Sequence, residues 1–218
     1  MAWPPPPHVT ELPLGGTLTV EVAPPTGLIF YVTDRSRREL ARLCLPYPRS
    51  GYGGHQVVLG PHPYAAVFLY SGQSQVGYEL FELETLRHLG GLPYERGDGD
   101  PPVFSPDGRH VAMVWDAGDL PRAEDHEERE HPPGARDVVV WGHLAVQVVN
   151  SRRVLRRALH ADLRGWRPSE QAEDQRPQGL RFVGSGQLRL RAPWGVEVSI
   201  ALPLAKRIVV PGPGAGRA

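Results

Sequence analysis

The stretch FSPDGRHVAMVW, Phe104–Trp115, decides which fold class the sequence predicts. Pro106 presets φ for the first position of a corner, Asp107 can bond to nearby backbone groups, and Gly108 accepts a positive φ. Apolar residues stand on both sides of this corner, so the stretch predicts a strand, a tight turn and a second strand. Whether the corner occurs once or repeatedly determines the architecture.

The corner recurs twice along the chain. The upstream stretch VVLGPHPYAAVFLY (57–70) aligns with it at an offset of 45 residues, and the downstream stretch LRFVGSGQLRLR (180–191) aligns at an offset of 78. The aligned pairs include Leu59 with Phe104, Pro61 with Pro106, Phe182 with Phe104 and Gly186 with Gly108. Recurrence of a corner between apolar strands indicates a repeated structural unit.

A polar turn follows each corner and leads into a shorter strand rich in Arg and Leu. The turn centres lie near Asp34, Glu84 and Asn150, which gives intervals of 50 and 66 residues. Subtracting the 22-residue charged insertion at 116–137 reduces the second interval to 44. A period of about 45 residues with four short strands per unit is typical of β-propeller blades.

The chain therefore resembles the β-propellers of the WD40 and TolB type, whose blades often carry an aromatic-Ser-Pro-Asp-Gly corner like residues 104–108. The resemblance covers most of residues 17–210 as a pattern and one unit as a sharp motif; Trp115-Asp116 ends the wrong strand for a WD signature. It implies an all-β, β-propeller-like fold with about four blades of four short antiparallel strands. The units are 17–45, 56–92, 102–160 and 180–210. The alternative is a β-sandwich of two packed antiparallel sheets, which has the same spacing of strands and turns.

Two features of this architecture stay open. The first unit lacks an opening strand, which residues 8–14 can supply either there or by completing the last unit. Four blades are few for a closed ring, so an open arc that pairs with a second copy or with a partner's blades is also considered. Inner strands should be continuously apolar, as AAVFLY, VAMVW and DVVVW are, whereas outer strands such as RRELARL and QLRLR should alternate.

The predicted organisation is a proline-rich tail at 1–8, a single all-β domain at 9–210 with the insertion at 116–137, and a flexible end at 211–218.

The insertion contains HEEREH, whose two histidines are five residues apart. The zinc-protease motif needs them four apart, on one face of a helix. We therefore expect no metal and no other cofactor.

Composition excludes several classes of protein. The 24 basic and 24 acidic residues cancel, so no overall field attracts the chain to nucleic acid or to a membrane. Cys44 is the single cysteine, which excludes an internal disulfide, and its strand LARLCLP predicts a small buried hydrophobe. We find neither a secretory signal nor a membrane-spanning segment, and we expect a cytoplasmic protein.

No nucleophile elbow or phosphate-binding loop is present, so the sequence favours a non-enzymatic protein–protein interaction or scaffold module. The predicted contact surface combines the acidic insertion with a basic strip at 151–167. Its residues are Glu124, Asp125, Glu127, Glu128, Arg152, Arg153, Arg156, Arg157 and Trp166. The expected partner is a protein, with a second copy of the chain as one possibility, and not nucleic acid or a membrane.

The competing hypothesis is a small enzyme or ligand-binding protein. Its site would use Tyr52, His55 and Gln56 from the glycine-rich loop at 51–56, GYGGHQ. Glycines give such a loop a conformational freedom that a plain connection between strands does not need. The simpler interpretation of the loop is a wide turn between the first two units.

Overall fold

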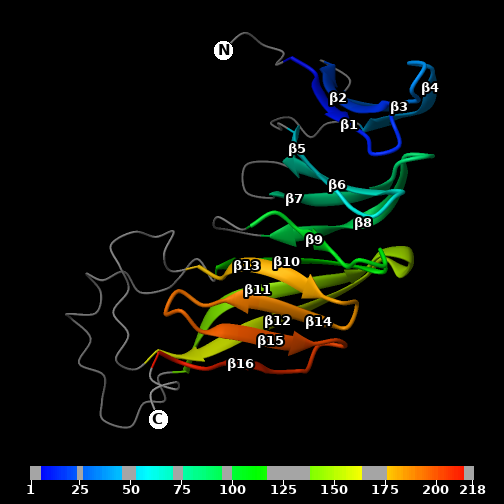
Figure 1. Cartoon of the computed structure of the whole chain (residues 1–218). Helices are drawn as coiled ribbons and strands as arrows, with labels where there is room; N and C mark the ends of the chain where they lie inside the picture. Colours follow the sequence, from blue (N-terminus) through cyan, green and yellow to red (C-terminus); the bar gives the residue numbers. More distant parts are fainter. Residues whose placement is uncertain are drawn as a thin grey trace. The chain divides into compact units, whose positions relative to one another are not determined.

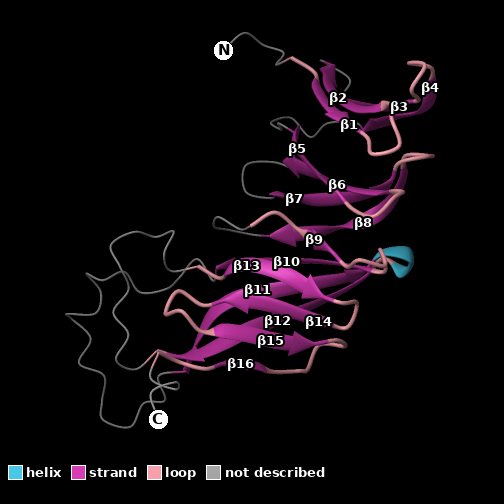
Figure 2. Cartoon of the chain, in the orientation of Figure 1, coloured by secondary structure: helices cyan, strands magenta, loops and turns pink. Residues whose placement is uncertain are grey.

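The computed structural model describes residues 6–23, 27–45, 53–70, 76–94, 100–116, 138–163 and 176–213 (Figure 1). Over these ranges the chain consists of β-strands and turns, with one short 3-10 helix, η1 (Val149–Ser151) (Figure 2). The prediction of an all-β fold is confirmed. The chain divides into two compact units. Unit 1 contains Met1–Glu95, Phe104–Val111 and Gln147–Arg153, and unit 2 contains Arg96–Val103, Ala112–Val146 and Val154–Ala218.

Two four-stranded antiparallel meanders build most of unit 1. Sheet 1 has the order β1 (His8–Glu11), β2 (Thr17–Ala23), β3 (Gly27–Thr33) and β4 (Glu39–Leu45). Sheet 2 has the order β5 (Gly53–Leu59), β6 (Tyr64–Tyr70), β7 (Val76–Glu82) and β8 (Arg87–Tyr94). Within each of these two sheets, each strand pairs with the next one along the chain.

The remaining strands form two further sheets. Sheet 3 has the order β16 (Ile208–Val210), β12 (Arg153–Asp162), β11 (Val138–Val148), β10 (His110–Asp116) and β9 (Val103–Phe104). Sheet 4 has the order β13 (Gln178–Val183), β14 (Gln187–Arg191) and β15 (Glu197–Ala201). β16 lies parallel to β12. In the described part of the chain there are thus four open sheets, and none of them closes on itself.

The four predicted units each supply most of one sheet, but their boundaries change at both ends of the chain. β1 pairs with β2 in the register His8↔Val20, so the N-terminal segment opens the first unit rather than completing the last. β16 leaves the fourth unit and joins sheet 3. The three polar turns predicted near Asp34, Glu84 and Asn150 connect the third strand to the fourth in sheets 1 to 3, which confirms them.

Three Pro-Gly corners share one backbone hydrogen bond. In the SPDG corner the Ser105 N–H donates to His110 O (2.8 Å) and the Gly108 N–H donates to Ser105 O (2.9 Å). Two corners of sequence LPLG and APWG, which escaped the sequence alignment, share the bond from the Gly N–H to the carbonyl three residues earlier, but their other bond spans four residues instead of five. Their bonds are Leu12 N–H to Gly16 O (3.1 Å), Gly15 N–H to Leu12 O (2.8 Å), Ala192 N–H to Val196 O (2.8 Å) and Gly195 N–H to Ala192 O (2.9 Å). The shared chemistry is Pro at the second position and Gly with positive φ at the fourth.

The aligned positions occupy equivalent places in their sheets. Leu59 ends β5, Phe104 ends β9, and Phe182 is the penultimate residue of β13. Leu59 and Phe104 directly precede the turn into the second strand, whereas Val183 stands between Phe182 and the turn; Leu59 and Phe182 pack against the cores of their respective units. The alignment at offsets of 45 and 78 therefore found structurally equivalent positions.

Apolar side chains of sheets 1 and 2 form the core of unit 1. In β3, Leu28, Phe30 and Val32 are buried, and the Phe30 ring lies 5.1 Å from the Phe81 ring of β7. Alternate residues of a strand point to the same face, which explains why these three share one core. Burying each large side chain contributes about 1.5–3 kcal/mol.

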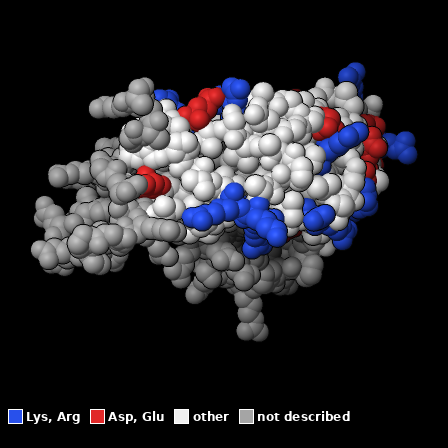
Figure 3. Space-filling model, turned by 90° about the horizontal axis from the view of Figure 1, so that it is seen from below, with Lys and Arg blue, Asp and Glu red and all other residues white. Residues whose placement is uncertain are grey.

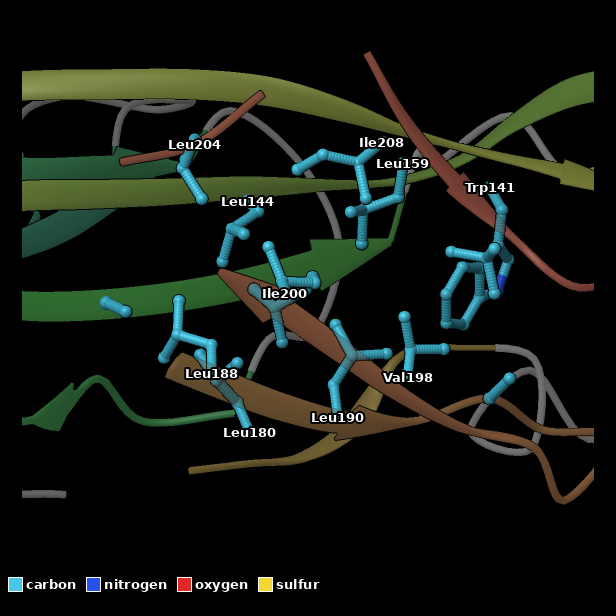
Figure 4. Close-up of a cluster of buried hydrophobic side chains, with 14 of the residues drawn as sticks. Trp141, Leu144, Leu159, Leu180, Leu188, Leu190, Val198, Ile200, Leu204 and Ile208 are labelled. Atoms are coloured by element: carbon cyan, nitrogen blue, oxygen red, sulfur yellow. The ribbon is translucent and has the colours of Figure 1, made fainter. Parts of the chain in front are cut away.

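In unit 2 the core lies between sheets 3 and 4 (Figure 4). Leu188 and Leu190 of β14 and Ile200 of β15 face Leu144 and Leu159 of sheet 3. The Trp141 and Trp194 rings pack 5.1 Å apart, and the Trp194 indole N–H donates to Pro211 O (2.8 Å). Two sheets with one shared apolar interior are the arrangement that the sandwich alternative predicts.

Continuous burial is confirmed for VAMVW and for the first four residues of AAVFLY, in which Leu69 is half-buried. Ala65–Phe68 in β6 and Val111–Trp115 in β10 are buried throughout. The prediction is wrong for DVVVW, because Val140 is 37% exposed and the continuously buried part of β11 begins at Leu144. QLRLR alternates as predicted, but it is β14, the middle strand of sheet 4, and not an outer strand.

Two further predictions of local structure are wrong. Cys44 is exposed, because β4 alternates and directs Leu43 and Leu45 toward the core instead. Residues 53–56 of the glycine-rich stretch do not form a loop but belong to β5. Most of the predicted tail at 1–8 and flexible end at 211–218 lies outside the described residues, and the single domain at 9–210 stays a prediction.

Candidate functional site

The acidic half of the predicted contact surface lies outside the described residues. This applies to Glu124, Asp125, Glu127 and Glu128 of the insertion and also to Trp166. A contact between the insertion and the basic strip therefore stays a prediction. The four predicted arginines are described, and they divide between the two units.

Arg152 and Arg153 belong to unit 1. Arg152 follows η1 with φ 55°, and its Nη2 donates to His88 O of β8 (2.6 Å). This bond ties the end of the turn to sheet 2, so Arg152 has a structural contact. Arg153 is exposed at the start of β12.

Arg156 and Arg157 belong to unit 2 and lie beside two basic residues that the sequence did not single out. Arg157 Nε donates to Ala205 O (3.0 Å), and its Nη1 donates to Arg156 O (2.7 Å). β12 and β16 run parallel from the pair Leu159↔Ile208 onward, which brings Lys206 and Arg207 alongside Arg157. We call Arg156, Arg157, Lys206 and Arg207 the basic patch.

The basic patch presents its charge to the surface. Arg156, Lys206 and Arg207 are exposed and Arg157 is half-buried. Figure 3 shows Lys and Arg side chains gathered on the face seen from below. Among the described residues, Arg157, Lys206 and Arg207 make no ion pair. Their positive charge is therefore not neutralised within the part of the chain that the structure describes.

Other arginines of unit 2 have carboxylate partners. Glu197 Oε2 accepts from Arg181 Nη2 (2.7 Å) and its Oε1 accepts from Arg189 Nη1 (3.1 Å), across the exposed face of sheet 4. The hydrogen bond from Arg181 holds the pKa of Glu197 below its ordinary value, with Arg189 adding to the effect. Compared with this paired cluster, the basic patch is better placed to attract an external anion.

One corner brings together a serine, an aspartate and a histidine, but not in a catalytic arrangement. The Ser105 hydroxyl donates to Asp107 Oδ1 (2.7 Å), and the His110 backbone N–H donates to Ser105 Oγ (2.9 Å). In a Ser-His-Asp triad the imidazole itself bonds to the serine hydroxyl and to the aspartate. The His110 ring makes neither bond, and its Nδ1 is buried and has no hydrogen-bond partner among the residues that the structure describes. These residues form the corner itself.

The described residues also contain no group of three or more His, Cys, Asp or Glu side chains that could hold a metal ion. Nor do they contain a helix that could cross a membrane. At the glycine-rich stretch, Gln56 Oε1 accepts from the Tyr78 hydroxyl (2.5 Å). Tyr52 and the His55 side chain lie outside the described side chains, so the site proposed there stays a prediction.

Unit 1 contains a concavity of about 380 Å³ that the sequence did not predict. It lies where the 12–15 corner of sheet 1 meets the turn after β3, His62 of the β5–β6 corner and the turn after β7. Its lining residues are Leu12, Leu14, Gly15, Val32, Thr33, Asp34, Arg35, Ser36, Leu40, His62, Leu83 and Glu84. These residues come from segments up to 72 positions apart (Leu12 to Glu84), which is why no local pattern reveals the site.

Comparison with known proteins gives no family. No family model and no curated protein matches the sequence. Solved structures with some similarity include the uncharacterized protein lmo1340 of Listeria monocytogenes (7% identity, TM-score 0.47, covering 90% of this chain and 53% of that one). Others are the cobalt-substituted Synechocystis ACO (10%, 0.39, 90% and 49%) and an acylaminoacyl peptidase of Pyrococcus horikoshii (10%, 0.36, 94% and 34%). The chain spans about half or less of each, and such weak similarity assigns no function.

Proposed function

We propose that this chain is a propeller-like interaction module that binds an acidic surface of a protein partner through the basic patch. Two consecutive four-stranded meanders and the recurring Pro-Gly corner support the propeller-like arrangement. The observation that supports binding is the unneutralised charge of Arg157, Lys206 and Arg207. We do not assign a catalytic activity.

The patch is held in a defined geometry. The Arg157 guanidinium is fixed by two backbone carbonyls, and the parallel pairing of β12 with β16 fixes the strand that follows Lys206 and Arg207. Little side-chain freedom is then lost when a carboxylate binds to Arg157. Complementary charge of this kind increases the rate and the specificity of association.

A protein partner fits the patch better than nucleic acid does. Nucleic-acid sites combine an extended track of basic side chains with aromatic residues on which bases stack. The basic patch has four residues from two neighbouring segments and no aromatic residue among them. The chain as a whole also has no net charge.

The test compares two double variants that remove the same amount of charge. Lys206→Ala/Arg207→Ala removes half of the patch, whereas Arg109→Ala/Arg191→Ala removes two exposed arginines elsewhere. Binding of fluorescent poly-L-glutamate to the full chain is measured by anisotropy at low and moderate salt. We expect the first variant to bind roughly tenfold more weakly, the control to bind as the original does, and the difference to shrink as salt rises.

Equal loss in the two variants would mean that the probe senses net charge and would contradict a specific site. A parallel titration with duplex DNA covers the other class of anion. DNA binding that is tighter than poly-L-glutamate binding, and that is lost in Lys206→Ala/Arg207→Ala alone, would overturn the assignment to a protein partner.

A further inference from the structure

The concavity of unit 1 has an apolar floor. Leu12, Val32 and Leu83 line it from three segments, and Val32 and Leu83 are also part of the core of unit 1. The floor is therefore held in place by the packing between sheets 1 and 2. A rigid apolar floor is what an aliphatic side chain needs in order to gain from burial.

Two leucines form the lips of the concavity. Leu14 is 57% exposed and Leu40 is 55% exposed, and both line the same concavity; exposed apolar side chains that are grouped in this way can mark an interaction site. Pockets for small molecules commonly enclose most of the ligand's surface. Here a small ligand on the floor would leave the lips in water, whereas a polypeptide lying across them would cover both.

The guanidinium of Arg35, at the rim of the concavity, can still bind an anion. Arg35 Nε donates to Leu14 O (2.6 Å), which holds the guanidinium at the lip, and its two terminal nitrogens make no ion pair with any described residue. Asp34 and Glu84 also line the concavity, and their contacts leave their negative charge in place, so Arg35 is the group of the lining that can pair with a carboxylate. Asp34 Oδ1 accepts the Ser36 N–H (2.8 Å) and the Arg38 N–H (3.0 Å), and Glu84 lies 3.7 Å from His62 Nε2.

We propose that this concavity binds an extended protein segment that inserts a leucine-type side chain between Leu14 and Leu40 and pairs an adjacent carboxylate with Arg35. Arg37 and Arg38, exposed on the same turn, make no ion pair with a described residue and add to the attraction for an acidic flank. An apolar anchor surrounded by a polar or charged rim is a common arrangement at protein interfaces. The site lies in unit 1 and does not depend on the basic patch of unit 2.

The probe is the capped peptide acetyl-Gly-Asp-Leu-Asp-Gly-amide, titrated into the full chain with leucine and valine methyl groups labelled for NMR. We expect saturable shifts at the methyl groups of Leu14, Leu40 and Leu83. The same peptide with Ser in place of Leu should cause no saturable shift. Shifts that never saturate, or equal shifts from the two peptides, would overturn the proposal.

Two variants and two matched controls locate the site. Leu40→Ser and Arg35→Gln should each weaken peptide binding by about tenfold, through loss of apolar contact and of charge respectively. Val209→Ser removes a residue that is 58% exposed, and Arg191→Gln removes an exposed arginine; neither lines the concavity, and neither should change binding. All variants are first checked for an unchanged methyl spectrum away from the substitution.

Two further binding measurements distinguish the ways in which this proposal could fail. Lys206→Ala/Arg207→Ala should bind the peptide normally, because the basic patch and the concavity are separate sites. If this variant loses the peptide, the peptide binds at the basic patch and the present inference is wrong while the proposed function stands. If hexanoate binds as tightly as the peptide and at the same leucines, the occupant is a small aliphatic acid and not a protein segment.

Discussion

Gly16 and Gly195 have nearly the same backbone conformation in different surroundings. Their φ angles are +89° and +86°, and each follows a corner or lies within one. A Cβ at Gly16 would lie 1.9 Å from the carbonyl oxygen of Thr33, whereas a Cβ at Gly195 would meet nothing within 4 Å. The two positions therefore separate the cost of positive φ from the cost of a backbone clash.

We expect Gly195→Ala to lower the free energy of unfolding by about 1 kcal/mol, the usual cost of positive φ for a residue with a Cβ. Gly16→Ala should lose that amount and at least about 2 kcal/mol more, because Thr33 belongs to the paired strand β3 and cannot move aside cheaply. Urea unfolding followed by circular dichroism measures both values. Equal losses would show that the Thr33 carbonyl does not confine Gly16.

Single residues explain both a success and a failure of the sequence interpretation. The SPDG corner was predictable, because Pro and Gly have strong local preferences that persist in the folded chain. The LPLG and APWG corners also have Pro at the second position and Gly at the fourth, but they lack the large apolar residue that the alignment used at Phe104: Glu11 and Arg191 stand directly before them. Cys44 was predicted to be buried from its apolar neighbours, but the alternation of β4 decides which side chains face the core.

The β7–β8 turn contains an ion pair whose strength should depend on pH. Arg87 Nε lies 3.1 Å from Glu82 Oε2, and the Thr85 hydroxyl donates to the same oxygen (2.8 Å). The hydrogen bond from Arg87, followed by that from Thr85, lowers the pKa of Glu82 from its ordinary value of 4.5. Because the pKa is lower in the folded state, this pair stabilises the fold above the ordinary value and loses its effect as pH falls through the folded value.

We expect Arg87→Gln to lower the free energy of unfolding only slightly at neutral pH, as is usual for an ion pair with access to water. The difference from the original chain should shrink as pH falls below the ordinary pKa of Glu82 and disappear once the pH is below its lowered pKa in the folded state, where Glu82 is protonated in both states. Arg191→Gln, which removes an arginine that has no ion pair among the described residues, should show no such trend. A loss from Arg87→Gln that is the same at all pH values would contradict a role for the Glu82 charge.

At the level of strands, the local sequence pattern predicted where strands and turns lie better than it predicted which strands pair with each other. Turns and strands of sheets 1 to 3 follow from polar clusters between apolar runs. The local pattern does not predict which strand lies at the edge of a sheet. The middle strand β14 has the same alternation that an edge strand has. The return of β16 to β12 was also not predictable, because it joins residues 49 positions apart (Leu159 to Ile208) through a parallel pairing that has no turn signal.

In the whole molecule, the candidate sites depend on these long-range pairings. Half of the basic patch, Arg156 and Arg157, was identified from its local charge. The other half, Lys206 and Arg207, depends on the position of β16, and the concavity depends on four turns of two sheets. The acidic insertion that the sequence analysis combined with these arginines lies outside the described residues.

The central claim about this protein is that the basic patch contacts an acidic protein. The most direct measurement is photo-crosslinking in native cells, with a benzophenone amino acid replacing Ala205, which is exposed beside Lys206; replacement of the exposed Ser199 of β15 is the control. We predict an adduct from position 205 to a protein, through a peptide rich in Asp and Glu, that is lost in the Lys206→Ala/Arg207→Ala background and absent from position 199. No protein adduct from position 205, or one that survives the loss of Lys206 and Arg207, would contradict the account.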